Sequence, residues 1–257
     1  MPNHVRLEVC VDSVASAAAA EQGGAHRVEL CSDLPEGGVT PSAGLIAMVR
    51  KRVAIGLQVL IRPRAGDFCY SADEFEVMTR DILLAKQLGV NGVVFGVLDA
   101  EGNVDTTRTR ELVVLARPLD VTFHRAFDMT RDLNVALEKV LKAGAHRILT
   151  SGAARTAEDG TEMIARLVKT AAGRLEIMAG GGIREENVQR ILEESGVREL
   201  HASLLSPVPS PMRFRNEEPV MGVLRGKEYE RFEVLPETVA RILQAVSEAQ
   251  LPSMPDR

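Results

Sequence analysis

The sequence alternates between two kinds of segment along most of its length, and this alternation constrains the fold more than any other feature. A short run of branched residues leads into a glycine-rich or polar turn and then into an amphipathic stretch. The predicted strands are Arg6–Val11, Arg27–Cys31, Gly56–Arg62, Gly92–Val97, Val121–His124, Arg147–Ser151, Leu175–Ala179 and Glu199–Ser203. So many strand–helix units in 257 residues predict one closed (β/α)8 TIM barrel. A doubly wound open sheet is the alternative, but it would need fewer units or a second domain.

The predicted helices begin where a side chain or a proline suits a helix N-terminus. Their predicted starts are Asp12 or Ser13, Thr40 followed by Pro41, Ser71 or Asp73, Asp105, Asp132, Glu158, Arg184 and Pro236. No linker divides the chain, so residues 1–257 are predicted to form a single domain. Two parts are expected to be irregular. One is a long rim loop at 204–235, interpreted as a flap or a subunit contact, and the other is a loose tail at 250–257.

The composition limits where in the cell the protein is expected and which kinds of partner it is expected to bind. Apolar residues make up 45% of the chain and aromatic residues only 4%, which suits a barrel filled by aliphatic side chains. The net charge is −5 without a basic stripe, so nucleic acid is not an expected partner. No apolar run reaches the roughly 18 residues that a membrane span needs. The three cysteines are few, and an odd number cannot all form disulfides within one chain, so a disulfide framework is not expected. We therefore expect reduced thiols in the cytoplasm.

Two neighbouring predicted strands carry the same Glu-x-Cys pattern. Side chains in a strand alternate between its faces, so Glu8 and Cys10 are predicted to point into the barrel, as are Glu29 and Cys31. Adjacent strands lie about 4.8 Å apart, so the two thiols are expected to come close together. Two sulfurs suit Cu(I) better than tetrahedral zinc. Simple packing of small buried cysteines is the alternative, and Cys69 is interpreted as a bystander.

Glu8 and Glu29 form a second pair of candidates. Two inward carboxylates can act as a general acid and a general base, because ionisation of one raises the pKa of the other. The alternative is a structural network in which Arg62, also predicted to point inward, neutralises both carboxylates.

An anion site is predicted on the same rim. The turn Gly180-Gly181-Gly182 and Ser203 follow strands seven and eight, where barrels of this class often bind phosphate. The three candidate arginines offer planar guanidinium groups to an anion; they are Arg62, Arg64 and Arg125. The alternative is that the glycines only permit a tight turn.

His124 and His201 end strands five and eight and are predicted to face inward, where histidine can carry protons or bind a metal. They are therefore further catalytic candidates, with an ordinary hydrogen-bonding role as the alternative. Asp67 and Asp128 lie on rim loops and are as suited to orienting an arginine as to reacting.

Several long sequence blocks resemble the CutC family of copper homeostasis proteins, in register over essentially the whole chain. The blocks are Leu7-Glu8-Val9-Cys10, Arg27-Val28-Glu29-Leu30-Cys31, Glu36-Gly37-Gly38-Val39-Thr40-Pro41-Ser42, Ile61-Arg62-Pro63-Arg64-Ala65-Gly66-Asp67-Phe68, Thr122-Phe123-His124-Arg125-Ala126-Phe127-Asp128, Leu149-Thr150-Ser151-Gly152 and Met212-Arg213-Phe214-Arg215-Asn216. The resemblance is greatest to the animal-type members.

The resemblance implies a TIM barrel, a cytoplasmic or nuclear location, a homo-oligomer and a role in copper handling. It implies no established catalysed reaction and no organic cofactor. In animal members the proposed Cu(I) ligands are two cysteines at the ends of the first two strands, which match Cys10 and Cys31 here.

Two functional hypotheses follow from the sequence. The first is a copper homeostasis protein that binds Cu(I) at Cys10 and Cys31. The second is a barrel enzyme that acts on a small anionic or phosphorylated metabolite, with Glu8, Glu29 and His124 transferring protons.

Overall fold

The computed structural model describes residues 5–216, 218–219 and 228–251. Its centre is a closed barrel of parallel strands in the order β1 to β8, in which β1 pairs with both β2 and β8. The barrel strands are β1 (Arg6–Val11), β2 (Arg27–Leu30), β3 (Gly56–Leu60), β4 (Gly92–Phe95), β5 (Asp120–Phe123), β6 (Arg147–Thr150), β7 (Glu176–Gly180) and β8 (Glu199–Ala202). The predicted (β/α)8 barrel is confirmed.

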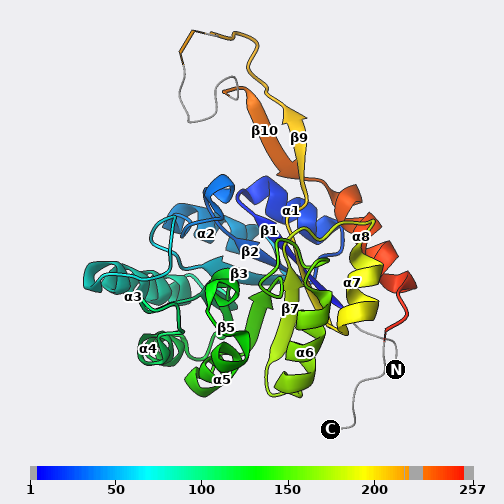
Figure 1. Cartoon of the computed structure of the whole chain (residues 1–257). Helices are drawn as coiled ribbons and strands as arrows, with labels where there is room; N and C mark the ends of the chain where they lie inside the picture. The colour runs from blue at the N-terminus through cyan, green and yellow to red at the C-terminus, as the bar shows by residue number, and fades with distance from the viewer. Residues whose placement is uncertain (1–4, 217, 220–227, 252–257) are drawn as a thin grey trace.

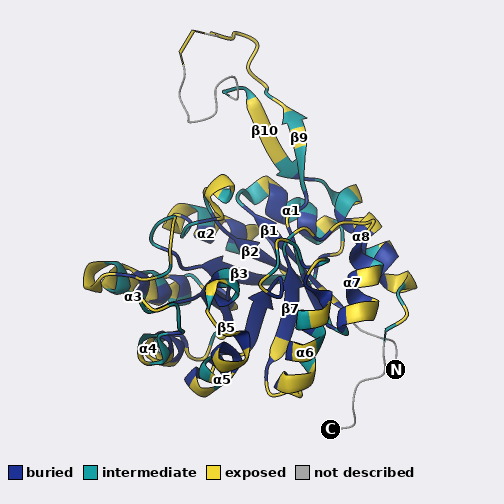
Figure 2. Cartoon of the chain, viewed as in Figure 1, coloured by how far each residue is buried: buried dark blue, intermediate teal, exposed yellow. Residues whose placement is uncertain are grey.

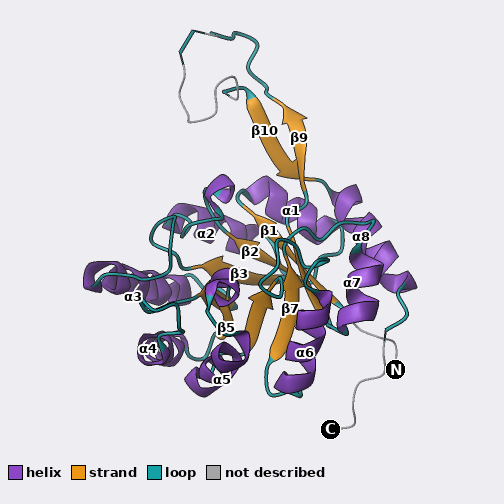
Figure 3. Cartoon of the chain, in the orientation of Figure 1, coloured by secondary structure: helices purple, strands orange, loops and turns teal. Residues whose placement is uncertain are grey.

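The helices surround the barrel strands, as Figures 1 and 3 show. They are α1 (Val14–Gln22), α2 (Ala43–Arg52), α3 (Ala72–Gln87), α4 (Thr106–Ala116), α5 (Leu133–Ala143), α6 (Thr161–Ala171), α7 (Val188–Ser195) and α8 (Pro236–Glu248). Two short 3-10 turns lie on the rim, η1 (Leu34–Glu36) after β2 and η2 (Arg125–Met129) after β5.

Several helices begin where the sequence predicts. Ser13, Asp105 and Asp132 accept hydrogen bonds from the first turns of α1, α4 and α5. Ser71 and Glu74 form a capping box at the start of α3, in which each side chain accepts from the other residue's backbone N–H.

Three predicted helix starts are wrong. The N-cap of α2 is Ser42, whose hydroxyl accepts from Leu45, whereas Thr40 lies two residues earlier. Residues 156–160 form a turn before α6, so that helix does not begin at Glu158. Residues 184–187 also form a turn, in which the backbone N–H of Arg184 donates to Asn187 Oδ1. Helix α7 begins after this turn and not at Arg184.

Two separate layers of side chains pack on the barrel wall. Leu7, Val9, Val28 and Leu30 belong to the large apolar core between strands and helices. A smaller buried cluster lies inside the barrel and contains Cys10, Cys31, Leu60 and Val94. Figure 2 shows the barrel strands buried and the outward surfaces of the helices exposed. The period-two alternation therefore separates the apolar core from the lumen as predicted.

The segment predicted as an irregular rim loop at 204–235 contains two strands. β9 (Leu205–Pro209) and β10 (Glu230–Val234) pair as an antiparallel ribbon that projects from the barrel (Figure 1). At its base, the backbone N–H of Val234 donates to Ser16 Oγ on α1. A role of this ribbon as a flap or subunit contact stays a prediction. Of the tail predicted at 250–257, residues 252–257 lie outside the described residues.

Candidate functional site

Strand register brings the two Glu-x-Cys patterns together inside the barrel. In the parallel pairing of β1 with β2, Cys10 is the partner of Glu29, and Glu8 is the partner of Arg27. Cys31 follows β2 directly, and its backbone N–H donates to the carbonyl of Val11 at the end of β1. The thiols therefore meet at the carboxyl end of the first two strands, the end at which TIM barrels carry their functional groups.

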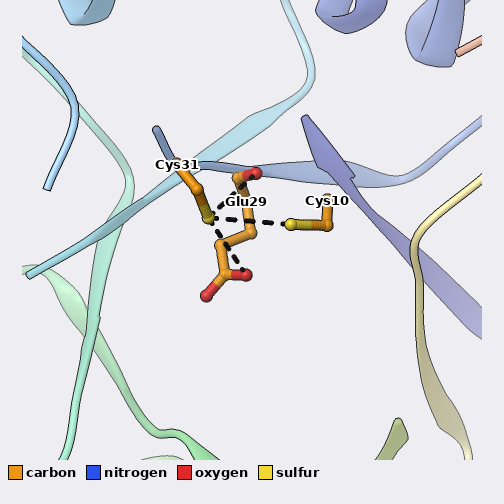
Figure 4. Close-up of side chains that lie close together, drawn as sticks. All are labelled: Cys10, Glu29 and Cys31. Atoms are coloured by element: carbon orange, nitrogen blue, oxygen red, sulfur yellow. Dashed lines mark hydrogen bonds between the residues drawn. The ribbon is translucent and has the colours of Figure 1, made fainter. Parts of the chain in front are cut away.

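Figure 4 shows Cys31 Sγ facing both Cys10 Sγ and the Glu29 carboxylate. The two sulfurs lie 3.6 Å apart, and Cys31 Sγ lies 3.6 Å from Glu29 Oε2. One ligand atom from each of the three residues lies within 4.8 Å of the other two, and all three residues are buried. Cys69 is exposed and free, as its interpretation as a bystander requires. Glu29 is a further candidate metal ligand. The sequence could have indicated it, because Glu29 lies two residues before Cys31 and therefore on the same face of the strand.

His201, on β8, lies between the two buried carboxylates. Its Nδ1 atom lies 2.8 Å from Glu8 Oε1, and its Nε2 atom lies 3.6 Å from Glu29 Oε2. Burial opposes protonation of the ring, but contacts with Cys10, Glu29 and Glu8 outweigh it and raise the pKa of His201 well above its usual value. His201 is therefore an imidazolium that carries a positive charge into the lumen.

The two thiols and the Glu29 carboxyl group differ in protonation state, mainly because of burial and of the hydrogen bond between the thiols. The hydrogen bond with Cys31 is the main cause that lowers the pKa of Cys10 to about 6, with further help from His201 and against the effect of burial. The same hydrogen bond, together with burial, raises the pKa of Cys31 well above its usual value. Burial is the main cause that raises the pKa of Glu29 to about 8. At neutral pH, Cys10 is a thiolate and Cys31 a thiol that donates to it.

Below this layer, two arginines and two glutamates form a buried ionic network. Arg27 Nε lies 2.5 Å from Glu8 Oε2, and its Nη2 atom binds Glu199, which also binds Arg147. The nearby Arg27, with His201 and Arg147, overcomes the effect of burial and lowers the pKa of Glu8 to about 2. Glu8 is thus a fixed negative charge, poorly suited to donate a proton at neutral pH.

The sequence-based assignment of Arg62 as the counter-charge of Glu8 and Glu29 is wrong. Arg62 follows the end of β3, and its guanidinium donates to backbone carbonyls on the rim: Nη1 to Glu36 and Gly38, and Nη2 to Gly66. Arg27 and His201 supply the positive charge instead.

The other two candidate arginines are engaged by acidic residues. Arg64 Nε lies 2.5 Å from Glu74, and its Nη2 atom lies 3.1 Å from Asp67. Arg125 Nε lies 2.8 Å from Asp128, and its Nη2 donates to Ser151 Oγ. Both aspartates therefore orient an arginine, one of the two roles considered for them.

The glycine turn lies against one of these arginines. Gly181 and Gly182 have φ of +104° and +75°, a conformation that favours glycine. A Cβ at Gly181 would lie 3.2 Å from Arg125 Nη1, so the guanidinium packs directly on the turn. Ser203 is exposed just after β8. Anion binding by these residues stays a prediction.

His124 does not join the cluster around His201. It follows β5, is 6% exposed, and its Nδ1 atom accepts a hydrogen bond from the backbone N–H of Ala126. Burial, assisted by the charge of Arg62, lowers the pKa of His124 to about 3, so the ring is neutral. The structure therefore gives the two histidine candidates opposite protonation states.

No helix in the described part of the chain is both long and apolar enough to cross a membrane. The CutC family model matches residues 5–206. A Chromobacterium violaceum protein named as a CutC family protein is 48% identical over 243 residues, covering 95% of this chain and 98% of its own. The human protein named copper homeostasis protein cutC homolog is 49% identical over 246 residues, covering 95% of this chain and 90% of its own.

Solved structures show the same relationship. The crystal structure of the CutC protein of Streptococcus agalactiae, titled a putative copper homeostasis protein, superposes with a TM-score of 0.74 at 33% identity, covering 77% of this chain and 97% of its own. Thiamine phosphate pyrophosphorylase of Pyrococcus furiosus, at 15% identity and a TM-score of 0.59 over 96% of this chain and 97% of its own, shares the fold alone. On the family match and these identities, the chain belongs to the CutC family.

Proposed function

We propose that the protein takes part in copper homeostasis by binding one Cu(I) ion between Cys10 and Cys31. The observation that carries the proposal is the 3.6 Å separation of two free, buried sulfurs on adjacent strands. Soft thiolate ligands select Cu(I), and Cys10 is already a thiolate at neutral pH. The names of the human and mouse relatives, both described as copper homeostasis protein homologues, support the same role.

The remaining donors favour Cu(I) over zinc. Structural zinc sites are almost always tetrahedral, with four protein ligands. Besides the two sulfurs, this cluster offers the Glu29 carboxyl group, which must lose its proton to bind a metal because its pKa is about 8, whereas both ring nitrogens of His201 face Glu8 and Glu29. A set of two sulfurs and one oxygen is thus short of a zinc site but sufficient for a soft ion that accepts few ligands. Reduced thiols also fit a cytoplasmic location.

Anaerobic titration of the reduced protein with Cu(I), in the presence of a chromophoric competitor, tests the proposal. We expect saturation near one equivalent per chain and complete loss of this binding in the Cys10→Ser/Cys31→Ser double variant. Cys69→Ser is the matched control, because it removes an exposed thiol outside the cluster. Unchanged Cu(I) binding by the double variant, with an unchanged circular dichroism spectrum, would refute the assignment of the ligands.

A further inference from the structure

A second polar cluster lies on the rim beyond β3 and β5, made of Arg62, Tyr70 and His124. The three residues are 6%, 4% and 6% exposed. Each has a buried polar atom without a hydrogen-bond partner among the described residues: Arg62 Nε, Tyr70 Oη and His124 Nε2. Leaving one such atom unpaired costs about 1–3 kcal/mol. Three of them in one place are a feature that the copper site does not explain.

Two of the three residues, Arg62 and His124, lie against the ring of Phe68. Arg62 Cζ lies 5.3 Å from the centroid of that ring, and the His124 ring centroid lies 4.9 Å from it. The positive charge of Arg62 acts on both other members. It opposes the effect of burial on Tyr70, whose pKa is nevertheless raised to about 12, and it adds to the effect of burial that lowers the pKa of His124. The unpaired atoms thus belong to one neighbourhood.

All three unpaired groups are hydrogen-bond donors. His124 accepts through Nδ1, so its proton is on Nε2. Tyr70 is a neutral phenol because burial raises its pKa. Arg62 keeps its Nε–H unpaired, while its terminal nitrogens are held by the carbonyls of Glu36, Gly38 and Gly66, which fix the plane of the guanidinium.

Three donors with one formal positive charge match an acceptor that carries one negative charge. A carboxylate has only acceptor sites and binds guanidinium in its plane, whereas a phosphate dianion would need a second free positive charge. A neighbouring arginine, Arg64, stacks over Tyr70 but is paired with Glu74 and Asp67. Asp128, which also acts on His124, is in turn paired with Arg125.

We propose that Arg62, Tyr70 and His124 bind the carboxylate of a small organic acid. The partly exposed Phe68 lies against Arg62 and His124, and the ligand enters when this side chain moves aside. The site adjoins the thiols, because Gly38, which accepts from Arg62, packs against Cys31: a Cβ on Gly38 would lie 3.3 Å from Cys31 Cβ. The proposal uses none of the groups that hold copper, and it goes beyond copper binding.

Isothermal titration of the reduced, metal-free protein with acetate, lactate and inorganic phosphate tests this site at constant ionic strength. We expect at least one of the two carboxylates to bind and to raise the melting temperature, and phosphate to bind at least tenfold more weakly. Tyr70→Phe removes only the hydroxyl, which lies beside the Arg62 guanidinium and whose O–H has no acceptor among the described residues. This variant should keep its melting temperature in plain buffer yet bind the carboxylate about tenfold more weakly or worse, as expected for a lost bond to a charged group.

Thr109→Val is the matched control, because it also removes a buried hydroxyl that lacks a partner in the described structure, but on α4. It should bind the carboxylate as the parent does, and so should the Cys10→Ser/Cys31→Ser variant, which separates this test from that of copper binding. The proposal is overturned if neither carboxylate binds, if phosphate binds as well as they do, or if Tyr70→Phe binds like the parent.

Discussion

The Nδ1 atom of His201 lies 2.8 Å from Oε1 of Glu8, which joins the last strand of the barrel to the first by a charged hydrogen bond inside the lumen. Glu8 is already ionised because Arg27 and His201 overcome the effect of burial on its pKa. The imidazolium that Glu8 holds is then available to stabilise a second anion. That anion is the Cys10 thiolate, whose pKa His201 helps to lower.

Replacing His201 should therefore make Cys10 a weaker acid. In His201→Gln the positive charge is lost, and we expect the pKa of Cys10 to rise by about one to three units, the usual effect of one adjacent opposite charge. Thiolate absorbance in the ultraviolet, followed as a function of pH, measures this pKa, and the Cys10→Ser variant identifies its signal. An unchanged pKa in His201→Gln would show that Cys31 alone activates Cys10.

Zinc should bind more weakly than Cu(I) and depend more on the carboxylate. Zinc needs oxygen or nitrogen ligands to complete its shell, whereas Cu(I) is satisfied by sulfur. We expect the purified protein to carry less than one zinc per chain, as measured by elemental analysis. We also expect Glu29→Gln to reduce zinc affinity more than Cu(I) affinity. One tightly held zinc per chain would contradict the preference for Cu(I).

The ionic network below the metal cluster should contribute strongly to stability. Glu199 accepts from both Arg27 and Arg147, and all three are buried. Glu199→Gln leaves two buried guanidinium groups short of a counter-charge, which should lower the free energy of unfolding by about 3–5 kcal/mol. Urea denaturation measures this loss.

An exposed ion pair provides the control for that measurement. Glu138 and Arg174 lie 2.9 Å apart with both side chains about half exposed. Solvent screens exposed pairs of this kind, so they contribute little to stability and Glu138→Gln should have little effect. Equal losses in the two variants would show that the buried network is no more stabilising than a surface pair.

His124 should make the protein less stable at acidic pH. Its pKa is about 3 in the folded state because of burial and Arg62, with Asp128 opposing, but near 6.5 in the unfolded chain. Between these values the unfolded state binds more protons, so stability rises with pH by up to about 1.4 kcal/mol per pH unit from this group. Above about pH 6.5 both states are neutral at this residue and its contribution to the slope ends.

His124→Phe should reduce the slope of unfolding free energy between about pH 4 and 6 in urea titrations, because phenylalanine does not titrate. The exposed-thiol variant Cys69→Ser is the comparison and should keep the parent's slope. A parental slope in His124→Phe would assign the acid sensitivity to other groups.

The alternation of strand residues was enough to predict which side chains enter the lumen. Leu7 and Val9 on β1 are helix-facing, so Glu8 and Cys10 had to point inward, and the same holds for Glu29 and Cys31. Because β1 and β2 are neighbours, the meeting of the two thiols also followed. Likewise, the eight units and most helix starts came from local patterns that do not depend on distant contacts.

The pairing of charges could not be predicted in the same way. Which arginine meets Glu8 depends on the register between strands, and Arg27 is its partner because the two residues lie opposite each other on β1 and β2. Arg62 shares the predicted inward face, but it lies beyond the end of β3, and its guanidinium reaches the carbonyl of Glu36 in η1. Its contacts there are with carbonyl groups, which leave no pattern in a sequence. The involvement of Tyr70 depends on the same loop and was missed for the same reason.

The pairing of β1 with β8 has a consequence for the protein during its synthesis. Both cysteines lie within the first 31 residues, whereas His201 is added about 170 residues after Cys31. Domains of this kind emerge from the ribosome from the N-terminus onward, at about 5–20 residues per second. A nascent chain therefore exposes both thiols for many seconds before the imidazolium that helps to ionise Cys10 has been made. Closure of the barrel adds the contribution of His201 to the low pKa of Cys10, so the finished metal site depends on a residue far along the chain from the segment that carries its sulfurs.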